Sequence, residues 1–501
     1  MDMIKLLYAK NVFSRKSLVR QQNLSFVILV ENLAFDKKID VKWAGENGVW
    51  HTLPAIYHSS VGQEKEYWIA RMAFVLAADE SLPGNVQFAL RYRVAEAEYW
   101  DNNQGENYCI QADSGIKVGH ENPVLNVGFE SSLSNGERRL PITVAVDRKI
   151  NAEKVTIDWT TDNWKSKQQS TCRFAHNYWD TECLSNARNP NQYGYQIWNE
   201  VLNVNDAFGV QYRIVCEARQ GVIWDDNFGH NYTVQRRALK VLILNLHCCQ
   251  EDNQDYKLSQ IARAIDELDV DIVCLQEVAE LWNNGQGNWE TNTARIINER
   301  LAAPYNLVTD WSHLGFDRYR EGVAILSRYP IEKHDGRYVS NSHDPFSIHS
   351  RKVVMARVRV PYIGLVNVFS AHLSWWDDGF PEQFEKLRQW AADESSNQIK
   401  ATMLCGDFNI KAGSQGYQRV VESNEYDDQY LSATAPQIFR KIFEHRDSYW
   451  HHDLDRDHRI DYEFLRKGSK LSVTSGRVLF TDQDYGRVSD HFGYLMAYVP
   501  E

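Results

Sequence analysis

The first half of the chain contains one sequence pattern twice, and this internal repeat constrains the fold more than any other feature. Residues 26–43 run through an apolar segment to a tryptophan, and residues 142–159 repeat that arrangement 116 residues later. A second block, residues 99–108, returns 124 residues later as residues 223–232. Repetition at a nearly fixed spacing indicates that one structural unit is built twice.

Each copy alternates apolar and polar residues over short stretches that are rich in Val, Tyr, Phe and Trp and separated by Asn, Asp and Gly. This pattern is typical of small β-sandwiches. We therefore expect two all-β sandwich modules in tandem, at residues 1–115 and 116–236. The linkers, about 111–122 between the copies and about 235–238 after them, are short. Short linkers favour docked modules over freely tethered ones.

A cluster of aromatic and amide side chains lies near the end of each copy. Trp and Tyr rings can stack on the apolar face of a sugar, and Asn amides offer paired donors and acceptors to hydroxyl groups. The cluster is therefore a candidate glycan site. Core tryptophans at positions 100 and 224, followed by asparagine-rich turns, explain the same residues equally well.

The copies resemble carbohydrate-binding module family 21, the starch- and glycogen-binding β-sandwiches also found in glycogen-targeting phosphatase subunits. The first copy keeps the family signature, an aromatic-Trp-Asp-Asn-Asn run followed by Asn-Tyr, from Tyr99 to Tyr108, whereas the second copy has Ile223 and Asp226 at two of its positions. The resemblance implies an α-glucan polymer, starch or glycogen, as a partner of the first copy. Because the linkers are short, we expect the second copy to be chiefly a spacer. The glycan-binding residues that it implies are Trp43, Trp50, Tyr99, Trp100, Asn102, Asn103, Asn107 and Tyr108, with Trp159 and Trp164 as further candidates in the second copy. Trp43 and Trp159 end apolar strands and are equally candidates for the core.

Charge and composition narrow the range of partners and compartments. The chain has 55 Lys and Arg against 67 Asp and Glu, a formal net charge of −12, which argues against a nucleic-acid partner. No run approaches the ~18 apolar residues that span a bilayer, and the first ten residues lack the apolar core of a secretion signal, so we expect a cytoplasmic protein without a membrane partner. The eight cysteines form no C-x-x-C pair and are expected to be reduced thiols, although Cys172 and Cys183 are candidates for a bridge in an oxidising compartment.

From residue 239 the pattern changes to alternating strand and helix signals. Residues 239–245 and 271–277 read as buried strands, and between them the apolar residues of 258–268 share one helical face. This indicates a layered α/β domain with polar residues at the strand ends, where such sheets usually place their sites. Further strands are expected at 322–327, 353–360, 365–370, 402–405 and 460–464, with a last one beginning near residue 491.

The strand ends supply a set of carboxylates, amides and imidazoles. Oxygen ligands in excess, with two histidines and no thiolate, favour Mg²⁺, or Mn²⁺, over structural zinc. Such an ion can bridge to a phosphoryl oxygen and orient a water for attack. Taken singly, each residue is more often a solvated strand end than a ligand, but eight of them together point to a site. The eight are Asn245, Glu277, His372, Asp407, Asn409, Asp461, Asp490 and His491.

The same stretch resembles the endonuclease/exonuclease/phosphatase superfamily over residues 239–499. Its motifs occur in order: Leu-Asn at 244–245, Leu-Gln-Glu at 275–277, Glu-Gly-Val-Ala-Ile-Leu-Ser-Arg at 321–328, Ala-His-Leu at 371–373, Gly-Asp-Phe-Asn at 406–409, Arg-Ile-Asp-Tyr at 459–462 and Ser-Asp-His at 489–491. The resemblance implies a four-layer, deoxyribonuclease-I-like α/β sandwich at residues 237–501 that hydrolyses phosphoesters. The expected fold is thus multidomain, with two all-β sandwiches before this catalytic domain.

The resemblance also implies roles for individual residues. The metal ligands would be Asn245, Glu277 and Asp490, while Asp407 and Asn409 would position the water and the phosphate. His491, oriented by Asp461, would act as base or phosphate clamp, and His372 would donate a hydrogen bond to the phosphate or protonate the leaving oxygen; the division of these acid and base roles stays open. Arg351 is a candidate bidentate phosphate contact and equally a candidate surface charge.

A narrower resemblance concerns the substrate. Residues 313–322, 372–380 and 489–493 are similar to the bacterial maltose 6′-phosphate phosphatases. This implies that His313, Arg351, Trp375 and Trp376 contact the substrate, although one of the two tryptophans is expected in the core. The sequence therefore predicts a Mg²⁺-dependent phosphoric monoester hydrolase acting on maltose 6′-phosphate or a related phosphorylated maltodextrin. A phosphodiesterase of the nuclease or sphingomyelinase type and an inactive glycan-binding scaffold remain as alternatives.

Overall fold

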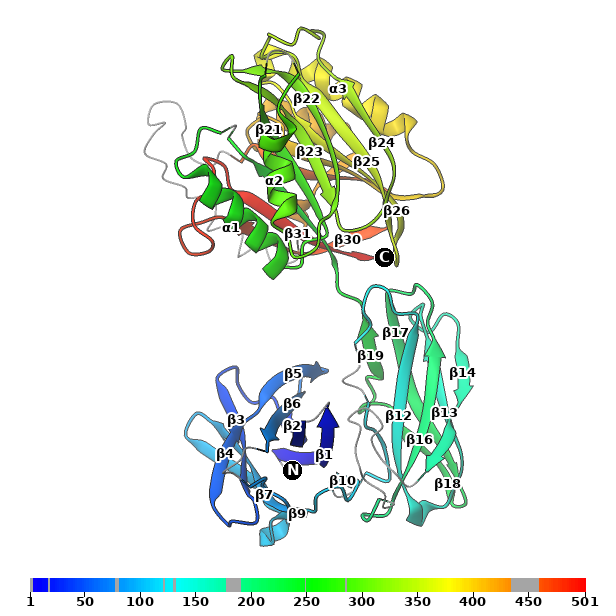
Figure 1. Cartoon of the computed structure of the whole chain (residues 1–501). Helices are drawn as coiled ribbons and strands as arrows, with labels where there is room; N and C mark the ends of the chain where they lie inside the picture. The colour runs from blue at the N-terminus through cyan, green and yellow to red at the C-terminus, as the bar shows by residue number, and fades with distance from the viewer. Residues whose placement is uncertain are drawn as a thin grey trace. The chain divides into compact units, whose positions relative to one another are not determined.

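The computed structural model describes residues 3–16, 19–76, 81–119, 122–128, 132–176, 191–247, 249–283, 286–433 and 459–501. Two compact units divide the chain, Met1–Arg236 and Arg237–Glu501 (Figure 1). Among the described residues, the first unit consists of strands, 3-10 turns and loops, and the second combines strands with α-helices. The expected fold class, all-β sandwiches followed by an α/β catalytic-type domain, is confirmed.

The first sandwich packs two sheets over one core. Its strands are β1 Ile4–Lys16, β2 Val19–Glu31, β3 Lys37–Ala44, β4 Trp50–Pro54, β5 Ile56–Val61, β6 Lys65–Val75, β7 Val86–Val94, β8 Ala97–Asp101, β9 Tyr108–Ile110 and β10 Ile116–Val118. One sheet has the order β10-β1-β2-β6-β5 and the other β4-β3-β7-β8, with β9 also paired to β7. Alternation along β3 buries Ile39, Val41 and Trp43 and leaves Lys42 on the opposite face.

The second sandwich repeats this arrangement. Its strands are β11 Val124–Asn126, β12 Arg139–Asp147, β13 Ala152–Thr160, β14 Gln168–Thr171, β15 Arg173–His176, β16 Tyr195–Asn203, β17 Gly209–Ala218, β18 Gly221–Asp225 and β19 Tyr232–Gln235. The sheets have the orders β11-β12-β16-β15 and β14-β13-β17-β18, with β19 also paired to β17. Strands β3, β7, β8 and β9 of the first sandwich therefore have their counterparts in β13, β17, β18 and β19.

The two sandwiches contact each other within the first unit. Apolar residues of both, including Val27 and Ile69 from the first and Val144 from the second, belong to one buried cluster. The Tyr67 hydroxyl of the first sandwich donates a hydrogen bond of 2.5 Å to Asn227 Oδ1 of the second. The two sandwiches are therefore docked rather than freely tethered, as the short linker predicts.

The second unit contains two layered sheets. The first is formed by β20 Leu239–Asn245, β21 Ile272–Leu281, β22 Asn306–Gly315, β23 Tyr319–Ser327, β30 Leu471–Leu479 and β31 Gly493–Pro500, in the order β22-β23-β21-β20-β31-β30. The second is formed by β24 Ile331–Tyr338, β25 Lys352–Val360, β26 Gly364–His372, β27 Ile399–Asp407, β28 Tyr426–Asp428 and β29 Asp461–Arg466, in the order β24-β25-β26-β27-β29-β28. Gln276 Nε2 of β21 donates 3.0 Å to Ser370 Oγ of β26, so the two sheets face each other.

Helices cover the outer faces of both sheets (Figure 1). They are α1 Gln254–Glu267, α2 Thr293–Glu299, α3 Phe380–Asp393, α4 Gln415–Glu422 and the short α5 Gln429–Ser432. Helices α1 and α2 share a buried cluster with the first sheet, and α3 and α4 share another with the second. The result is the expected four-layer α/β sandwich. All the strands predicted in this half are present, whereas β22, β24, β28 and β30 were not predicted.

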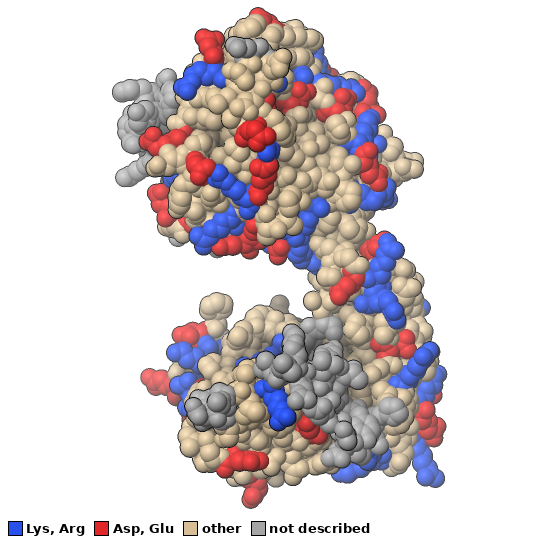
Figure 2. Space-filling model, viewed as in Figure 1, with Lys and Arg blue, Asp and Glu red and all other residues tan. Residues whose placement is uncertain are grey.

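Other sequence expectations concern cysteines, membranes and charge. Cys172, Cys216, Cys274 and Cys405 are buried free thiols and Cys109 is an exposed one, while Cys183 and Cys248 lie outside the described residues. The described helices include none that is long and apolar enough to span a membrane. On the face shown in Figure 2, basic side chains are interspersed with acidic ones.

Candidate functional site

Four strands of the second unit bring side chains to one buried cluster. Asn245 ends β20, His372 and Asp407 end β26 and β27, and Glu277 lies within β21, four residues before its end. The Asn245 amide donates hydrogen bonds to Glu277 Oε1 at 3.0 Å and to Asp407 Oδ2 at 3.1 Å. Because β20 and β27 belong to different sheets, this amide ties both sheets together at the site.

Irregular backbone places two of these groups. A β-bulge interrupts the pairing of β21 with β23 between Leu275 and Val278, and Glu277 within it has a φ of 49°. Bulges redirect side chains next to active sites, and a left-handed backbone at a non-glycine residue is sustained only by its surroundings. Gly406, with a φ of 127°, precedes Asp407, and a Cβ there would lie 2.2 Å from the carbonyl oxygen of Ala371.

The cluster holds more buried acid than its neighbours neutralise. Burial, then the nearby charge of Glu321, raises the pKa of Glu277 to about 8. Burial, then the charge of Asp461, raises the pKa of Asp407 to about 7. One ligand atom each from Glu277, Glu321 and His372 lies within 4.8 Å of the others. Carboxylates that are difficult to ionise because they are buried beside one another suit a hard divalent cation.

The imidazole of His491 lies between carboxylates. Its Nδ1 is 2.8 Å from Asp461 Oδ2, and its Nε2 is 3.8 Å from Asp407 Oδ2. Burial lowers the pKa of His491, but the charges of Asp461 and Asp407 outweigh burial and raise the pKa well above its ordinary value. The structure therefore brings Asp461, Asp407 and His491 together, with His491 oriented by Asp461.

A buried arginine, Arg351, also belongs to the cluster. Arg351 is buried, with its Nη1 3.2 Å from His372 Nδ1 and 3.3 Å from His372 Nε2. Burial, then the charge of Arg351, holds the pKa of His372 well below its ordinary value, so this imidazole is neutral. His372 Nε2 lies 3.8 Å from Asp407 Oδ2. Arg351 is thus part of the site and not a surface charge.

Asn409 and His313 hold the surroundings of the cluster in place. The Asn409 backbone N–H donates 2.8 Å to Asp407 Oδ1, and its side-chain amide donates 2.8 Å to the Leu373 carbonyl. His313 Nδ1 lies 3.0 Å from the Ser350 carbonyl, and its Nε2 lies 3.6 Å from Glu321 Oε1. Burial, the largest influence, lowers the pKa of His313.

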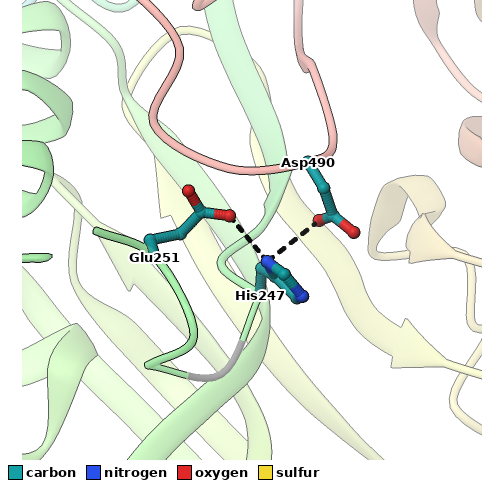
Figure 3. A group of neighbouring side chains, drawn as sticks. All are labelled: His247, Glu251 and Asp490. Atoms are coloured by element: carbon teal, nitrogen blue, oxygen red, sulfur yellow. Dashed lines mark hydrogen bonds and ion pairs between the residues drawn. The ribbon is translucent and has the colours of Figure 1, made fainter. Parts of the chain in front are cut away.

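Asp490 lies in a separate group, which includes two residues that sequence reasoning missed. The segment between β20 and α1 and the segment between β30 and β31 bring Asp490 together with His247 and Glu251 (Figure 3). His247 Nδ1 lies 2.6 Å from Glu251 Oε1 and 3.7 Å from Asp490 Oδ1. Asp490 Oδ1 is also 4.0 Å from His491 Nε2, so this group borders the buried cluster.

Glu321 is a third residue that sequence reasoning missed. It lies near the start of β23 and enters the cluster because β23 pairs antiparallel with β21, with Ala279 opposite Glu321. The signal was present, since Glu321 is the first residue of a motif that the superfamily resemblance includes, but its approach to Glu277 depends on strand register.

The two tryptophans after His372 separate. Trp375 is 53% exposed, whereas Trp376 packs against the core of the second sheet, with its ring 6.2 Å from that of Phe380. Trp376 is thus partly buried against the core, in line with the expectation for one of the pair. Of the two, Trp375 is the one that presents its ring to solvent.

The first sandwich carries a hollow on the outer face of its β4-β3-β7-β8 sheet. The hollow has a volume of ≈ 630 Å³, within the usual range for small-molecule sites. Trp50 and Trp100, 49% and 45% exposed, form two of its walls. Its lining residues are Lys42, Trp50, Ala89, Trp100, Asn102 and Asn107.

Several predicted glycan contacts build the fold instead. Trp43 and Tyr108 are 4% and 3% exposed core residues, so neither ring is available to a sugar, and this part of the expectation is corrected. The Tyr108 hydroxyl donates 2.8 Å to Asp101 Oδ1. Asn103 Nδ2 donates 3.0 Å to the Asn107 carbonyl and shapes the turn, while Tyr99 packs against the same core.

The matching position on the second sandwich is filled by a side chain. β3 pairs Lys42 with Ala89 of β7, and β13 pairs Asp158 with Arg213 of β17 at the corresponding place. The Arg213 guanidinium lies 4.6 Å from the Trp224 ring centroid and 5.3 Å from that of Trp164, and its Nη2 is 3.4 Å from Asp158 Oδ2. The alanine floor of the first hollow is thus replaced by an arginine that lies against both rings.

Comparison with known families agrees with both halves of this description. Residues 242–491 match the Endonuclease/Exonuclease/phosphatase family, and residues 7–111 match the carbohydrate/starch-binding module family 21. The chain is 29% identical over 185 residues to the uncharacterized protein YbhP of Escherichia coli K12, which covers 35% of this chain and 68% of that protein.

Two further relatives cover separate parts of the chain. Protein phosphatase 1 regulatory subunit 3E of Mus musculus is 37% identical over 84 residues, 16% of this chain and 28% of that protein. The solved structure of an endonuclease/exonuclease/phosphatase family protein from Leptotrichia buccalis C-1013-b is 28% identical, with a TM-score of 0.44, and covers 52% of this chain and 100% of that chain. By the two family matches, residues 242–491 are similar to the endonuclease/exonuclease/phosphatase family and residues 7–111 to the family 21 carbohydrate/starch-binding modules.

Proposed function

We propose that this protein is a metal-dependent phosphatase that hydrolyses the phosphomonoester of maltose 6′-phosphate or a related phosphorylated maltodextrin. The observation that carries the proposal is that one buried cluster holds three carboxylates together with hydrogen-bond donors suited to phosphate. The carboxylates are Glu277, Glu321 and Asp407; His372 lies 3.8 Å from both Glu321 Oε1 and Asp407 Oδ2, and Arg351 contacts its ring. A phosphate bound there would meet both a cation site and hydrogen-bond donors.

The carboxylates of the cluster fit Mg²⁺, or Mn²⁺, by their donor chemistry. Glu277 and Asp407 have raised pKa values because they are buried and lie beside other carboxylates, and carboxylate oxygens are the ligands that these ions prefer. Glu277 is the principal ligand that we propose, with Glu321 beside it and Asp490 approaching from the neighbouring group. A bound ion would neutralise charge on the phosphate and polarise its oxygens.

The residues of the chain have separate tasks in this proposal. Arg351 donates charge-assisted hydrogen bonds to the phosphate, for which a guanidinium is well shaped. Asp407, held by the Asn245 amide and the Asn409 backbone N–H, orients the attacking water. His491 keeps its charge through Asp461 and stabilises the negative charge that develops on the phosphate.

A sugar phosphate fits the surroundings of the cluster. Trp375 follows His372 by three residues and is exposed, so its ring is a platform for the sugar that carries the phosphate. The hollow on the first sandwich supports an α-glucan as the same protein's second ligand, since its Trp rings and Asn amides suit a sugar. We propose a cytoplasmic location because an exposed free thiol such as Cys109 is typical of reducing compartments.

Phosphate release by the purified full chain tests the proposal. The substrates are maltose 6′-phosphate, a phosphorylated maltodextrin, a bis-aryl phosphodiester and plasmid DNA, each with Mg²⁺ and with a chelator. We expect Mg²⁺-dependent release from the two sugar phosphates that is lost in Asp407→Asn and kept in Asp393→Asn, a change at an exposed helical position. Cleavage of the diester or of DNA in preference to the sugar phosphates would overturn the proposal.

A further inference from the structure

Lys42 gives the hollow of the first sandwich a positive charge. It lies on β3, opposite Thr52 of β4 and Ala89 of β7, and lines the hollow together with Trp50 and Trp100. Its ammonium group donates 2.5 Å to Thr52 Oγ1. Because that hydroxyl is neutral, this contact does not compensate the charge of the lysine.

The acidic side chains near Lys42 are engaged elsewhere. Asp40, on the same strand, accepts hydrogen bonds from Arg91 Nε and Nη2, both at 3.0 Å. Glu98 Oε1 accepts from Trp100 Nε1 at 2.8 Å and Glu98 Oε2 lies 3.7 Å from Arg91 Nη1. Within the described part of the chain, Lys42 forms no ion pair, so its charge in the hollow is not neutralised.

The second sandwich shows the opposite arrangement at the corresponding place. Asp158 replaces Lys42, and its carboxylate is paired with Lys167 at 2.9 Å and with Arg213 at 3.4 Å. These pairs hold the pKa of Asp158 below its ordinary value, although burial acts in the opposite direction. In the second sandwich, where Arg213 fills this place, the charges of Asp158 and its partners balance. In the first sandwich, where the hollow is open, Lys42 has no ion pair within the described residues.

We propose that the hollow binds α-glucan bearing a phosphate monoester in preference to neutral α-glucan, with the Lys42 ammonium as the phosphate contact. A phosphate monoester carries a charge of about −2 near neutral pH, and a lysine ammonium binds it as a point charge. The rings of Trp50 and Trp100 take the sugars and Ala89 leaves room between them. This inference rests on the proposed glucan binding by the same hollow and is independent of the phosphatase reaction.

Calorimetric titration of the full chain tests this inference. The protein carries Asp407→Asn and is kept with a chelator, so that the ligand is not hydrolysed. The ligands are maltoheptaose and maltoheptaose with one phosphate monoester. The variants are Lys42→Met, Trp100→Ala and Lys38→Met, in which the control Lys38 is exposed on β3, four residues earlier and outside the lining.

We expect the phosphorylated ligand to bind about tenfold tighter at low ionic strength and the difference to narrow as salt screens the charge. Lys42→Met should abolish the preference while keeping the affinity for maltoheptaose, Lys38→Met should keep the preference, and Trp100→Ala should weaken both ligands. If the protein without a substitution in the hollow bound both ligands equally, or if the preference for the phosphorylated ligand survived Lys42→Met, this inference would be overturned. The proposed glucan binding would still stand. Failure of both ligands to bind would overturn the proposed glucan binding as well.

Discussion

The buried cluster of the second unit and the open hollow of the first sandwich hold their side chains by different means. Asn245 and Asp407 are buried and joined by a hydrogen bond of 3.1 Å, and Asn409 fixes Asp407 from its other side. Trp50 and Trp100 are half exposed and owe their separation to strand register around the small Ala89. The cluster therefore depends on each group in it, whereas the hollow depends on two rings and the space between them.

The largest expected effect is a loss of turnover in variants of the buried cluster that leaves glucan binding by the hollow intact. Asp407→Asn, Glu277→Gln and His491→Ala should each lower kcat by about 10²- to 10⁴-fold, because each removes a charge placed for the transition state. The affinity for α-glucan should stay unchanged in all three. Steady-state kinetics and calorimetric titration on the same preparations measure both quantities. Near wild-type turnover by folded His491→Ala would contradict the assignment of the cluster.

Metal binding should stabilise one region alone. At 100 times its dissociation constant, a cation bound only by the folded state adds about 2.7 kcal/mol to the free energy of unfolding. Mg²⁺ should therefore raise the Tm of the chelator-treated protein by several degrees, since 1 kcal/mol shifts Tm by about 2–4 °C in domains of this size.

The rise in Tm should be retained in Trp100→Ala and reduced in Glu277→Gln. Differential scanning calorimetry with and without Mg²⁺ measures it. An equal rise in wild type and in Glu277→Gln would place the ion elsewhere in the protein.

Removing the Trp100 ring from the hollow should weaken glucan binding and leave turnover unchanged. Trp100→Ala should weaken α-glucan binding about tenfold or more, since buried Trp contacts at binding sites are worth at least about 1.4–2 kcal/mol. The kcat for a small phosphate monoester should stay unchanged. Trp289→Ala, which removes an exposed ring of the second unit, is the matched control. Undiminished glucan binding by Trp100→Ala would show that the hollow is not the site.

The smallest expected effect comes from opening the second sandwich. Arg213→Ala with Asp158→Lys recreates the pairing of Lys42 with Ala89 on β13 and β17. In a Trp100→Ala background, this double change should restore glucan binding weakly, by roughly two- to fivefold. Calorimetric titration against the single Trp100→Ala variant measures the gain. If Trp100→Ala alone leaves no binding and the double change adds none, side-chain filling is not what distinguishes the two sandwiches.

The buried cluster was largely predictable because polar residues at the ends of buried strands are conspicuous in a sequence. Asn245, Glu277, His372 and Asp407 each follow an apolar strand, and the structure gathers them at one place. Glu321 was missed because its position depends on the register of β23 against β21. His247 and Glu251 were missed because they lie in loops, where no strand pattern marks them.

The hollow was less predictable because successive side chains of a strand point to opposite faces of the sheet, and the sequence does not show which of the two faces is covered. Trp43 and Lys42 are neighbours on β3, so that one enters the core and the other faces the hollow. An aromatic residue alone does not reveal which face it occupies, so the sequence left Trp43 open between a glycan contact and a core residue, and the structure places it in the core. The Asn-rich signature serves both expected roles, since Asn103 builds the turn while Asn102 and Asn107 line the hollow.

The most direct test of the proposed reaction is the ratio of kcat/KM for maltose 6′-phosphate to that for glucose 6-phosphate, measured with Mg²⁺ on the purified full chain. Both substrates present the same phosphate to Arg351 and His372, so the ratio reports only the second sugar. We expect a ratio well above ten, because the exposed Trp375 ring can bind that sugar in the transition state. A ratio near one, or hydrolysis of a phosphodiester in place of both sugar phosphates, would contradict an α-glucan phosphate as the substrate.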